Sequence, residues 1–477
     1  MRLFLFWTSN EPEIKNLIAA LKKESHQVIY WVGDKQEEKG DDFPEIIFQE
    51  HNQAQMGLLA EGVDDSDFLP PGKDLIEQLY QTESLVLTMM NKRFDWMCAD
   101  ERRHLYYNLL QYWHGILKKY QPDMLIFSSI PHAPYEYVVY NLARLLNIKT
   151  FMFYDTLIPD RLLFYNDFWR GSTILQEKLA SDNKEDYALE NLSGDLREYY
   201  QLQTNPEYDS TPVYIKAFRK QNTAGRYAAI KIRTIITSLK DFSIFRKVLA
   251  YFLKLFGPNV KKEYHELQTK PDLNKKFIYA PLNYQPECTT SPQAGIFVDQ
   301  ILMIETLAAS IPESWFIYVK EHPTQWAPRG LNYFSSRYRG YYRRLAKIKN
   351  VVLIPTETDT YELMKKTQAV ATATGTAGWE SVLRLKPAIV FGYPWYRDCP
   401  GVFKVNDAAS CQKAIKEINN GYRVSQQQII NYFQSFDEAT IRDRYFISGV
   451  KGSDGLNRDK SIGNIIQTVL MELKKYS

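Results

Sequence analysis

The order of apolar runs and helical patterns in the first half of the chain predicts a parallel α/β sheet. Residues 3–8 form an apolar run, residues 11–24 repeat apolar side chains at helical spacing, and residues 27–32 return to an apolar run. A strand, a helix and a strand in this order predict a βαβ unit. Two further helical patterns and two further apolar runs follow, at 74–92, 101–120, 122–129 and 150–154.

The second half of the chain repeats this alternation and predicts a second sheet. Its apolar runs have the length of strands, are separated by helical patterns, and begin at Lys276, Trp315, Val351, Ala369 and Pro387. A length of 477 residues also exceeds one ordinary domain. We therefore expect an α/β protein with a first domain over 1–210, a helical linker over 211–270 and a second domain over 271–477, whose last helix is a candidate to pack back on the first domain.

The middle of the chain is strongly basic. Residues 213–262 contain twelve Lys or Arg residues and one acid, Asp241, and their apolar residues fall roughly at helical spacing. Basic amphipathic helices of this kind bind anionic membrane surfaces. An ordinary interdomain helix with a solvated basic face explains the pattern equally well, so peripheral membrane association remains one of two interpretations.

Composition excludes several classes of protein. The hydrophobic share of 45% and the charged share of 24% are typical of a globular protein, and a net charge of +3 gives no nucleic-acid signal. The four cysteines lack the paired spacing of a zinc site or a disulfide framework, which favours a reducing compartment. No apolar run approaches the roughly 20 residues that span a bilayer. We expect a cytoplasmic protein, and the membrane interpretation of 213–262 would place it at the periphery of the inner membrane.

The strongest local signal is a turn of small residues between an apolar run and a helical pattern. It consists of Thr374, Gly375, Thr376, Ala377 and Gly378. Amides at a helix N-terminus lack intrahelical partners and favour a phosphate, and the threonine hydroxyls add donors. Glu380, one helical turn further on, would bind ribose hydroxyls or cap the helix. The simpler interpretation is that the glycines only make the turn tight.

Two neighbouring apolar runs of the second half also end in polar residues. Gln285 and Glu287 follow the first run, and Glu287 could act as acid, base or nucleophile. Lys320, His322 and Pro323 follow the second, where a histidine can donate to a phosphate and stabilise a departing nucleotide. Alone, such a histidine would be structural, but the glycine turn one strand and helix later favours a phosphate contact.

In the first half, acceptor binding is the predicted role of residues that follow two apolar runs. His132 and Glu136 come after the run that ends near residue 129, and Asp155 comes after 150–154. Ligands bind at the carboxyl ends of strands in α/β sheets, and both His132 and Glu136 can transfer protons. The alternative is a loop histidine and a glutamate that serves as a charge at a helix start.

The motifs of residues 277–404 together resemble the bacterial capsule polysaccharide biosynthesis family, which includes transferases of 3-deoxy-manno-octulosonic acid (Kdo) that use a cytidine monophosphate (CMP) donor. The matching motifs are Gln285-Pro286-Glu287, His322-Pro323 and the turn from Thr374 to Gly378. The resemblance implies a GT-B architecture, in which two Rossmann-like domains face each other across a cleft. It also implies a nucleotide held by the second domain, an acceptor held by the first, and neither a metal nor another cofactor.

Three functions remain in competition. The leading hypothesis is a glycosyltransferase that moves Kdo or a related acidic keto-sugar from its CMP conjugate to a glycan or lipid-linked acceptor. Here His322 and the turn balance charge on the phosphate, Glu287 or Glu136 handles the acceptor proton or attacks the sugar, and Lys320 holds the donor carboxylate. The alternatives are a transferase for a uridine or guanosine diphosphate sugar and a glycan-assembly protein of the same fold without turnover. Fold alone does not distinguish them.

Overall fold

The structure, a computed structural model, describes residues 1–8, 13–34, 42–181, 186–205, 259–287, 289–326, 337–443 and 458–476. The basic segment 213–262 lies almost wholly outside these ranges, so the membrane and linker interpretations of this segment stay predictions. Cys288 also lies outside them. Within the described residues, no helix is both long and apolar enough to cross a membrane.

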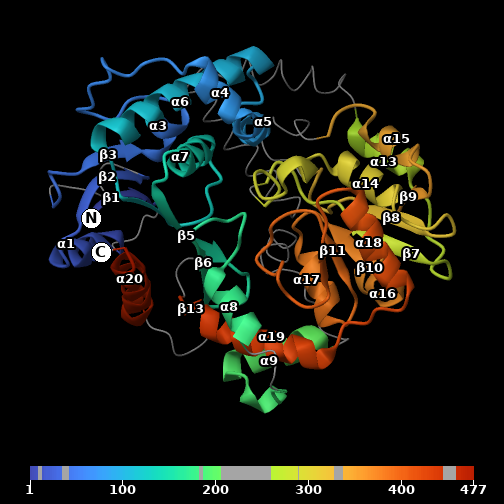
Figure 1. The fold of residues 1–477 in the computed structure, drawn as a ribbon. Helices are drawn as coiled ribbons and strands as arrows, with labels where there is room; N and C mark the ends of the chain where they lie inside the picture. Colours follow the sequence, from blue (N-terminus) through green and yellow to red (C-terminus); the bar gives the residue numbers. More distant parts are fainter. Residues whose placement is uncertain are drawn as a thin grey trace, which may run out of the picture.

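The first domain is built on a seven-stranded sheet with the order β13-β6-β5-β4-β1-β2-β3 (Figure 1). Its strands are β1 (Arg2–Phe6), β2 (Gln27–Gly33), β3 (Ile47–Glu50), β4 (Met124–Phe127), β5 (Lys149–Asp155), β6 (Arg161–Tyr165) and β13 (Ile441–Arg442). The five strands from β5 to β3 are parallel, and β6 and β13 add an antiparallel edge. The predicted parallel sheet is confirmed.

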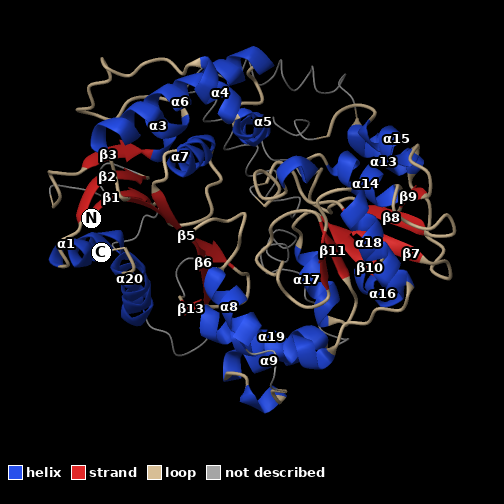
Figure 2. Ribbon diagram, viewed as in Figure 1, coloured by secondary structure: helices blue, strands red, loops and turns tan. Residues whose placement is uncertain are grey.

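Helices cover both faces of this sheet (Figure 2). The helices in this part of the chain are α1 (Glu13–Lys23), α3 (His51–Gln55), α4 (Lys73–Gln78), α5 (Tyr80–Met89), α6 (Ala99–Tyr120), α7 (Pro134–Leu145), α8 (Thr173–Ser181) and α9 (Gly194–Thr204), with short 3-10 turns at Met90–Lys92 (η1) and Leu189–Asn191 (η2); of these, α8 and α9 lie near α19 (Gln426–Ala439) and α17 (Thr376–Leu383) of the second part of the chain. Strand β1 shows why: Leu3 and Leu5 pack into one core layer, whereas Phe4 and Phe6 pack into the other. A strand buried on both faces needs a continuous apolar run.

The second domain has a six-stranded parallel sheet with the order β12-β11-β10-β7-β8-β9. Its strands are β7 (Phe277–Pro281), β8 (Phe316–Lys320), β9 (Val351–Leu353), β10 (Ala369–Thr372), β11 (Ala388–Val390) and β12 (Val402–Lys404). Its helices are α13 (Val260–Leu267), η3 (Gly295–Val298), α14 (Gln300–Ala308), α15 (Tyr341–Ala346), α16 (Thr360–Lys366), α17 (Thr376–Leu383) and α18 (Ala408–Asn419).

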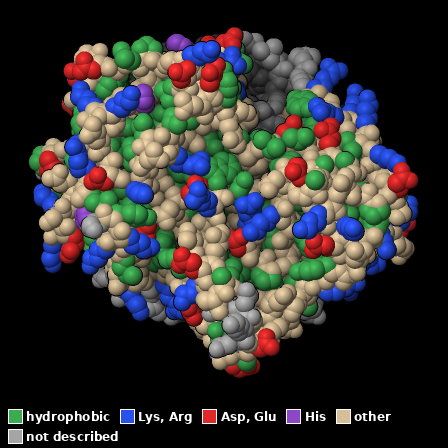
Figure 3. All heavy atoms as spheres, in the orientation of Figure 1, with side chains coloured by type: hydrophobic (Ala, Val, Ile, Leu, Met, Phe, Trp, Pro, Cys, Tyr) green, Lys and Arg blue, Asp and Glu red, His purple; other side chains and the backbone are tan. Residues whose placement is uncertain are grey.

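Two helices from the end of the chain connect the domains. Helix α19 (Gln426–Ala439) packs on α8, and one core cluster runs continuously from the first domain to Trp379 and Phe433. Helix α20 (Arg458–Lys474) then returns to the first sheet, where it lies beside α1 (Figure 1). The two α/β units thus form the GT-B-like arrangement that the resemblance implied. On the face shown in Figure 3, basic side chains gather near the middle, where the domains meet.

One predicted helix is divided in the structure. The pattern over 74–92 forms α4, α5 and η1, and the break lies at Leu79, whose φ of −112° leaves the helical region. The spacing of apolar residues continues across the break, which is why the sequence indicates one helix.

Candidate active site

Three neighbouring strands of the second sheet carry the predicted donor residues at their carboxyl ends. Strand β7 leads to Asn283, β8 leads to His322, and β10 leads to Gly375, with β7 between the other two. The chain winds outward through β8 and β9 on one side of β7 and through β10, β11 and β12 on the other. This reversal of strand order is the place where open α/β sheets bind ligands.

The glycine turn is held against the β7 loop by a short polar chain. The buried hydroxyl of Thr372 accepts the Gly375 N–H at 3.0 Å and donates to Asn283 Oδ1 at 3.1 Å. A Cβ on residue 375 would lie 2.8 Å from Thr372 Oγ1, closer than real Cβ contacts. Gly375 is therefore required by the close approach of its neighbours, while its φ of −67° is available to any residue.

Helix α17 begins directly after this glycine and presents its N-terminus at the same edge. Gly375 is the N-cap, and no side chain of the described residues caps the first turn. The first amides of a helix have no intrahelical acceptor, and the helix dipole adds partial positive charge. The turn therefore has the composition of an anion site.

The hydroxyls of the turn are engaged with protein acceptors. Thr374 Oγ1 donates to the Thr289 carbonyl, and Thr376 Oγ1 donates to Glu380 Oε1 at 3.2 Å. We therefore expect the backbone amides of Thr376 and Ala377, and not these hydroxyls, to donate to a phosphate. Gly378 is required by packing: a Cβ at this position would lie 2.5 Å from the hydroxyl of Tyr396, on which the turn packs.

A methyl group at residue 375 should disturb the anion site without unfolding the protein. We expect Gly375→Ala to weaken CMP binding about tenfold, because displacement of the turn would lose a hydrogen bond to a charged phosphate, worth about 1.5 kcal/mol. Titration calorimetry with CMP measures the effect. Gly194→Ala is the matched control, since a Cβ there meets no atom within 4 Å. Equal CMP affinity in the two variants would remove the turn from the site.

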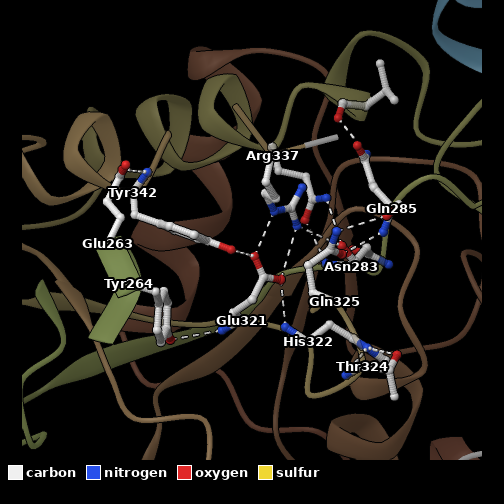
Figure 4. A network of polar contacts seen from close by, with 12 residues as sticks. Glu263, Tyr264, Asn283, Gln285, Glu321, His322, Thr324, Gln325, Arg337 and Tyr342 are labelled. Carbon is white, nitrogen blue, oxygen red and sulfur yellow. Dashed lines mark hydrogen bonds and ion pairs between the residues drawn. The ribbon is translucent and has the colours of Figure 1, made fainter. Parts of the chain in front are cut away.

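His322 is oriented by the loop that follows it (Figure 4). The Thr324 N–H lies 3.3 Å from His322 Nδ1, and the Thr324 hydroxyl lies 2.9 Å from the same atom. An N–H can only donate, so Nδ1 is an acceptor and the neutral ring carries its proton on Nε2. The half-buried ring, 5.7 Å from the ring of Tyr284, therefore supplies a hydrogen-bond donor.

A buried ion pair fixes the end of β8 beneath this histidine. Glu321 has 0% and Arg337 1% side-chain exposure, and two Arg337 nitrogens donate to the two carboxylate oxygens at 2.7 and 3.1 Å (Figure 4). Burial alone would lower the pKa of Arg337, but the Glu321 carboxylate outweighs it and raises that pKa, so the guanidinium stays charged. Glu321 Oε1 also accepts the His322 N–H at 2.7 Å.

The same network reaches the β7 loop. Arg337 donates to the Asn283 carbonyl at 3.1 Å, so the charge pair ties the ends of β7 and β8 together. Gln325 and Gln285 add a reciprocal tie: the Gln285 N–H donates to Gln325 Oε1 at 3.0 Å, and Gln325 Nε2 donates to the Gln285 carbonyl at 2.9 Å. These ties between the loops hold Asn283 and His322 in fixed positions.

Other predicted donor residues have structural contacts of their own. The side-chain amide of Gln285 donates, through Nε2, to the Val298 carbonyl at 2.9 Å. The buried Lys320 ammonium donates to the Thr358 carbonyl at 2.6 Å and to Thr360 Oγ1 at 2.8 Å, so we do not assign it to the donor carboxylate. Pro323 is exposed after β8, and Glu287 is half-buried on the β7 loop.

In the first domain, Glu136 caps α7. Its Oε2 accepts the N–H groups of His132 at 3.0 Å and Ala133 at 2.9 Å, and its Oε1 accepts the Tyr135 hydroxyl at 3.2 Å. The residue is 5% exposed. These contacts match the structural alternative for Glu136, a charge at a helix start, and leave His132 as the more accessible of the two.

Asp155 lies on the face of β5 opposite to the interdomain contact. Phe151 and Phe153 lie four and two positions before Asp155, so they share its face of β5, and both belong to the core layer under α1 and α20. Tyr154 points the other way, and its hydroxyl lies 3.4 Å from Gln293 Oε1 of the second domain. The sequence did not single out Tyr154, because the face of a strand that meets a second domain is invisible in the pattern alone.

Asp155 also predicts a pH dependence of stability. Burial raises the pKa of its carboxyl and Asp443 raises it further, while the Leu157 amide opposes both. A raised folded-state pKa gives stability that is complete below the unfolded value, about 3.9, and is lost as pH rises through the folded value. We expect Asp155→Asn to raise Tm at pH 7 and to lose this gain near pH 4, as measured by thermal unfolding.

Asp195→Asn is the control for this prediction and should have the opposite sign. Burial would raise the pKa of Asp195, but the guanidinium of Arg161, 2.7 Å away, holds it below its ordinary value. Asp195→Asn should therefore lower Tm at pH 7. A lower Tm for Asp155→Asn at pH 7 would contradict the account of Asp155.

No metal site is visible among the described residues. None of their His, Cys, Asp and Glu side chains form a group of three that could hold an ion.

Comparison with known families bears on this domain. Residues 288–435 match the model of a family described as capsule polysaccharide biosynthesis protein. The predicted resemblance to this family is confirmed. The matched span contains His322 and the glycine turn, and it begins directly after Gln285 and Glu287. No curated protein matches the chain.

Several solved structures are similar to the chain over most of its length. The beta Kdo 2,7 transferase of Thermosulfurimonas dismutans KpsC is 9% identical, with 98% of this chain and 100% of that chain covered and a TM-score of 0.37. The beta Kdo 2,4 transferase of the same protein is 11% identical, with coverage of 72% and 87% and a TM-score of 0.33. A UDP-GlcNAc 2-epimerase from Methanocaldococcus jannaschii is 11% identical, with coverage of 99% and 100% and a TM-score of 0.25. None of these likenesses identifies an activity.

Proposed function

We propose that this protein is a glycosyltransferase of surface polysaccharide synthesis that transfers Kdo or a related acidic keto-sugar from a CMP-sugar to a glycan or lipid-linked acceptor. One observation supports it above the others. The segment that matches the capsule polysaccharide biosynthesis family contains both His322 and the α17 turn, at strand ends only two strand spacings, about 10 Å, apart.

The chemistry of the leaving group fits these residues. When the bond between the anomeric carbon and the phosphate oxygen breaks, CMP departs with its bonding electrons and gains negative charge. The Nε2–H of His322 and the first amides of α17 are fixed donors that stabilise such charge. The Glu321–Arg337 pair and the glutamine contacts hold the His322 loop, and Thr372 holds the α17 turn, so both sets of donors are pre-positioned.

The acceptor side needs a base for the hydroxyl that attacks the anomeric carbon. Glu287 is the predicted carboxylate for this role, because it is half-buried on the loop that follows β7, and the Thr289 carbonyl of the same loop accepts the Thr374 hydroxyl. Glu136, the second candidate in the sequence, already accepts three hydrogen bonds at the start of α7. Since Glu287 is also the more exposed of the two, we assign the proton transfer to Glu287.

A panel of nucleotide sugars tests the proposal. Purified protein is incubated with CMP-Kdo, CMP-sialic acid, UDP-glucose and GDP-mannose, and nucleotide release is measured. We expect release from a CMP-sugar, and Glu287→Gln should abolish it while CMP still binds. Release only from a diphosphate sugar would replace the proposal with the UDP or GDP transferase, and CMP binding with no release from any donor would favour the assembly protein without turnover.

A further inference from the structure

A second pocket lies at the carboxyl edge of the first sheet. Its lining includes His51, Gln55, Lys92, Arg93 and His132. His51 follows β3 directly, His132 lies in the loop after β4, and the other side is formed by the end of α5 and by η1. The sequence pointed to His132 alone, because residues from three distant segments make up the rest.

Basic groups dominate this pocket. Lys92 and Arg93 are exposed, and among the described residues neither side chain forms an ion pair with a carboxylate. The Arg93 guanidinium donates to the neutral Asn52 Oδ1 at 2.8 Å. Among the described residues, two acids act on His51 from nearby: Glu136, whose oxygens already accept three hydrogen bonds, and Asp34, which follows β2. The described lining thus contains two cations and no carboxylate, and the nearby Glu136 and Asp34 balance their charge from outside the lining.

The two histidines are held in defined orientations. His51 Nε2 lies against the Gln55 amide nitrogen, which can only donate, so the proton is on Nδ1, 2.8 Å from the Tyr135 hydroxyl. His132 Nδ1 lies 2.8 Å from the Ile130 carbonyl, to which it donates.

The charge of His51 responds to its surroundings. Burial lowers the pKa of His51 and Arg93 adds to this, while Glu136 and Asp34 oppose it. An anion near the ring would favour its protonation. The ring therefore reports on the arrival of an anion in the pocket.

The pocket is connected to the candidate donor site by a short path through the protein. Met89 lines the pocket, and the hydroxyl of its neighbour Thr88 lies 2.6 Å from Ser291 Oγ of the second domain. Ser291 is on the β7 loop that carries Glu287, and on that loop the Thr289 carbonyl accepts the hydroxyl of Thr374. The pocket is thus linked, through Thr88 and Ser291, to the loop that holds the proposed base.

We propose that this pocket binds an acidic group of the acceptor, a carboxylate or a phosphate, and that Arg93 is its main charged contact. The identity of the ligand as the acceptor rests on the proposed function, whereas the binding of an anion does not. Guanidinium groups bind both kinds of oxyanion through two parallel hydrogen bonds.

Histidine signals test the proposal in the full chain. Protein labelled with carbon-13 in the histidine rings is titrated with glucuronate, which carries a carboxylate, and separately with glycerol phosphate. The chain has seven histidines, so His51→Gln and His132→Gln identify the two signals by their loss. We expect at least one probe to shift both signals in a saturable manner. A shift with glucuronate alone indicates an acidic sugar, and a shift with glycerol phosphate alone indicates a headgroup phosphate.

Arg93→Gln should weaken the binding of that probe about tenfold, the loss expected for one charge-assisted contact. Arg343→Gln is the matched control, because Arg343 is exposed on α15 of the other domain. The absence of shifts at both histidines, or equal affinity in Arg93→Gln and the control, would overturn the proposal. Anion binding without nucleotide release from any sugar donor would refute the proposed function and leave this pocket established.

Discussion

Replacement of His322 with alanine is expected to lower kcat/KM for the nucleotide-sugar donor by about 100-fold or more. The ring has its proton on Nε2 because Thr324 donates to Nδ1, so the substitution removes one fixed donor. Loss of such a donor to developing negative charge costs about 2.7 to 4 kcal/mol in the transition state. His322→Gln should recover part of the rate, because its amide nitrogen can occupy a similar position.

Initial rates of nucleotide release measure this effect. His104→Ala is the control, since His104 is exposed on α6 in the other domain. A rate for His322→Ala equal to that of the control would exclude a role for this ring in the reaction. A higher KM with unchanged kcat would mean that His322 binds the ground state and the transition state equally.

Removal of the Glu321 carboxylate should have the largest effect on stability. Glu321→Ala leaves the Arg337 guanidinium buried without its charge partner and removes an acceptor from Tyr342, whose hydroxyl lies 2.5 Å from Glu321 Oε2. Breaking one partner out of a buried pair typically costs about 3 to 5 kcal/mol. We therefore expect a large fall in Tm, together with weaker CMP binding, because the ends of β7 and β8 lose their common anchor.

Two further variants separate the charge pair from simple loss of packing. The double replacement of Glu321 and Arg337 by methionine should be less destabilised than Glu321→Ala, because no charge remains buried alone. Glu305→Ala removes a partner from the exposed pair with Arg344 and should cost no more than about 1 kcal/mol. Thermal unfolding of these variants beside the unchanged protein tests this order. A double variant as unstable as Glu321→Ala would show that charge pairing is not what holds the site.

The parts of the fold that the sequence predicted are those that depend on local periodicity. Apolar runs marked the buried strands because both faces of each sheet are covered by helices, as the division of Leu3 and Phe4 between two core layers shows. The positions of His322 and Gly375 followed as well, since both come directly after such runs. The carboxyl ends of parallel strands meet at one edge, so these residues had to lie near one another.

The contacts of individual side chains could not be predicted in the same way. Arg337 lies in a segment rich in tyrosine and arginine, and nothing in that segment marks the one arginine that pairs with Glu321. Lys320 looked available at a strand end, but its direction is set by the loop around Thr358. Asp155 and Tyr154 differ only in which face of β5 they occupy, and that depends on how the domains meet.

The most direct test of the account is a crystal structure of the protein with CMP. We predict that its phosphate lies at the N-terminus of α17, within hydrogen-bond distance of the Thr376 or Ala377 amide and of His322 Nε2. CMP bound at another place, such as the pocket between the domains lined by Trp169, Tyr393 and Arg397, would contradict the central claim. So would the absence of bound CMP at a concentration that saturates the protein in solution.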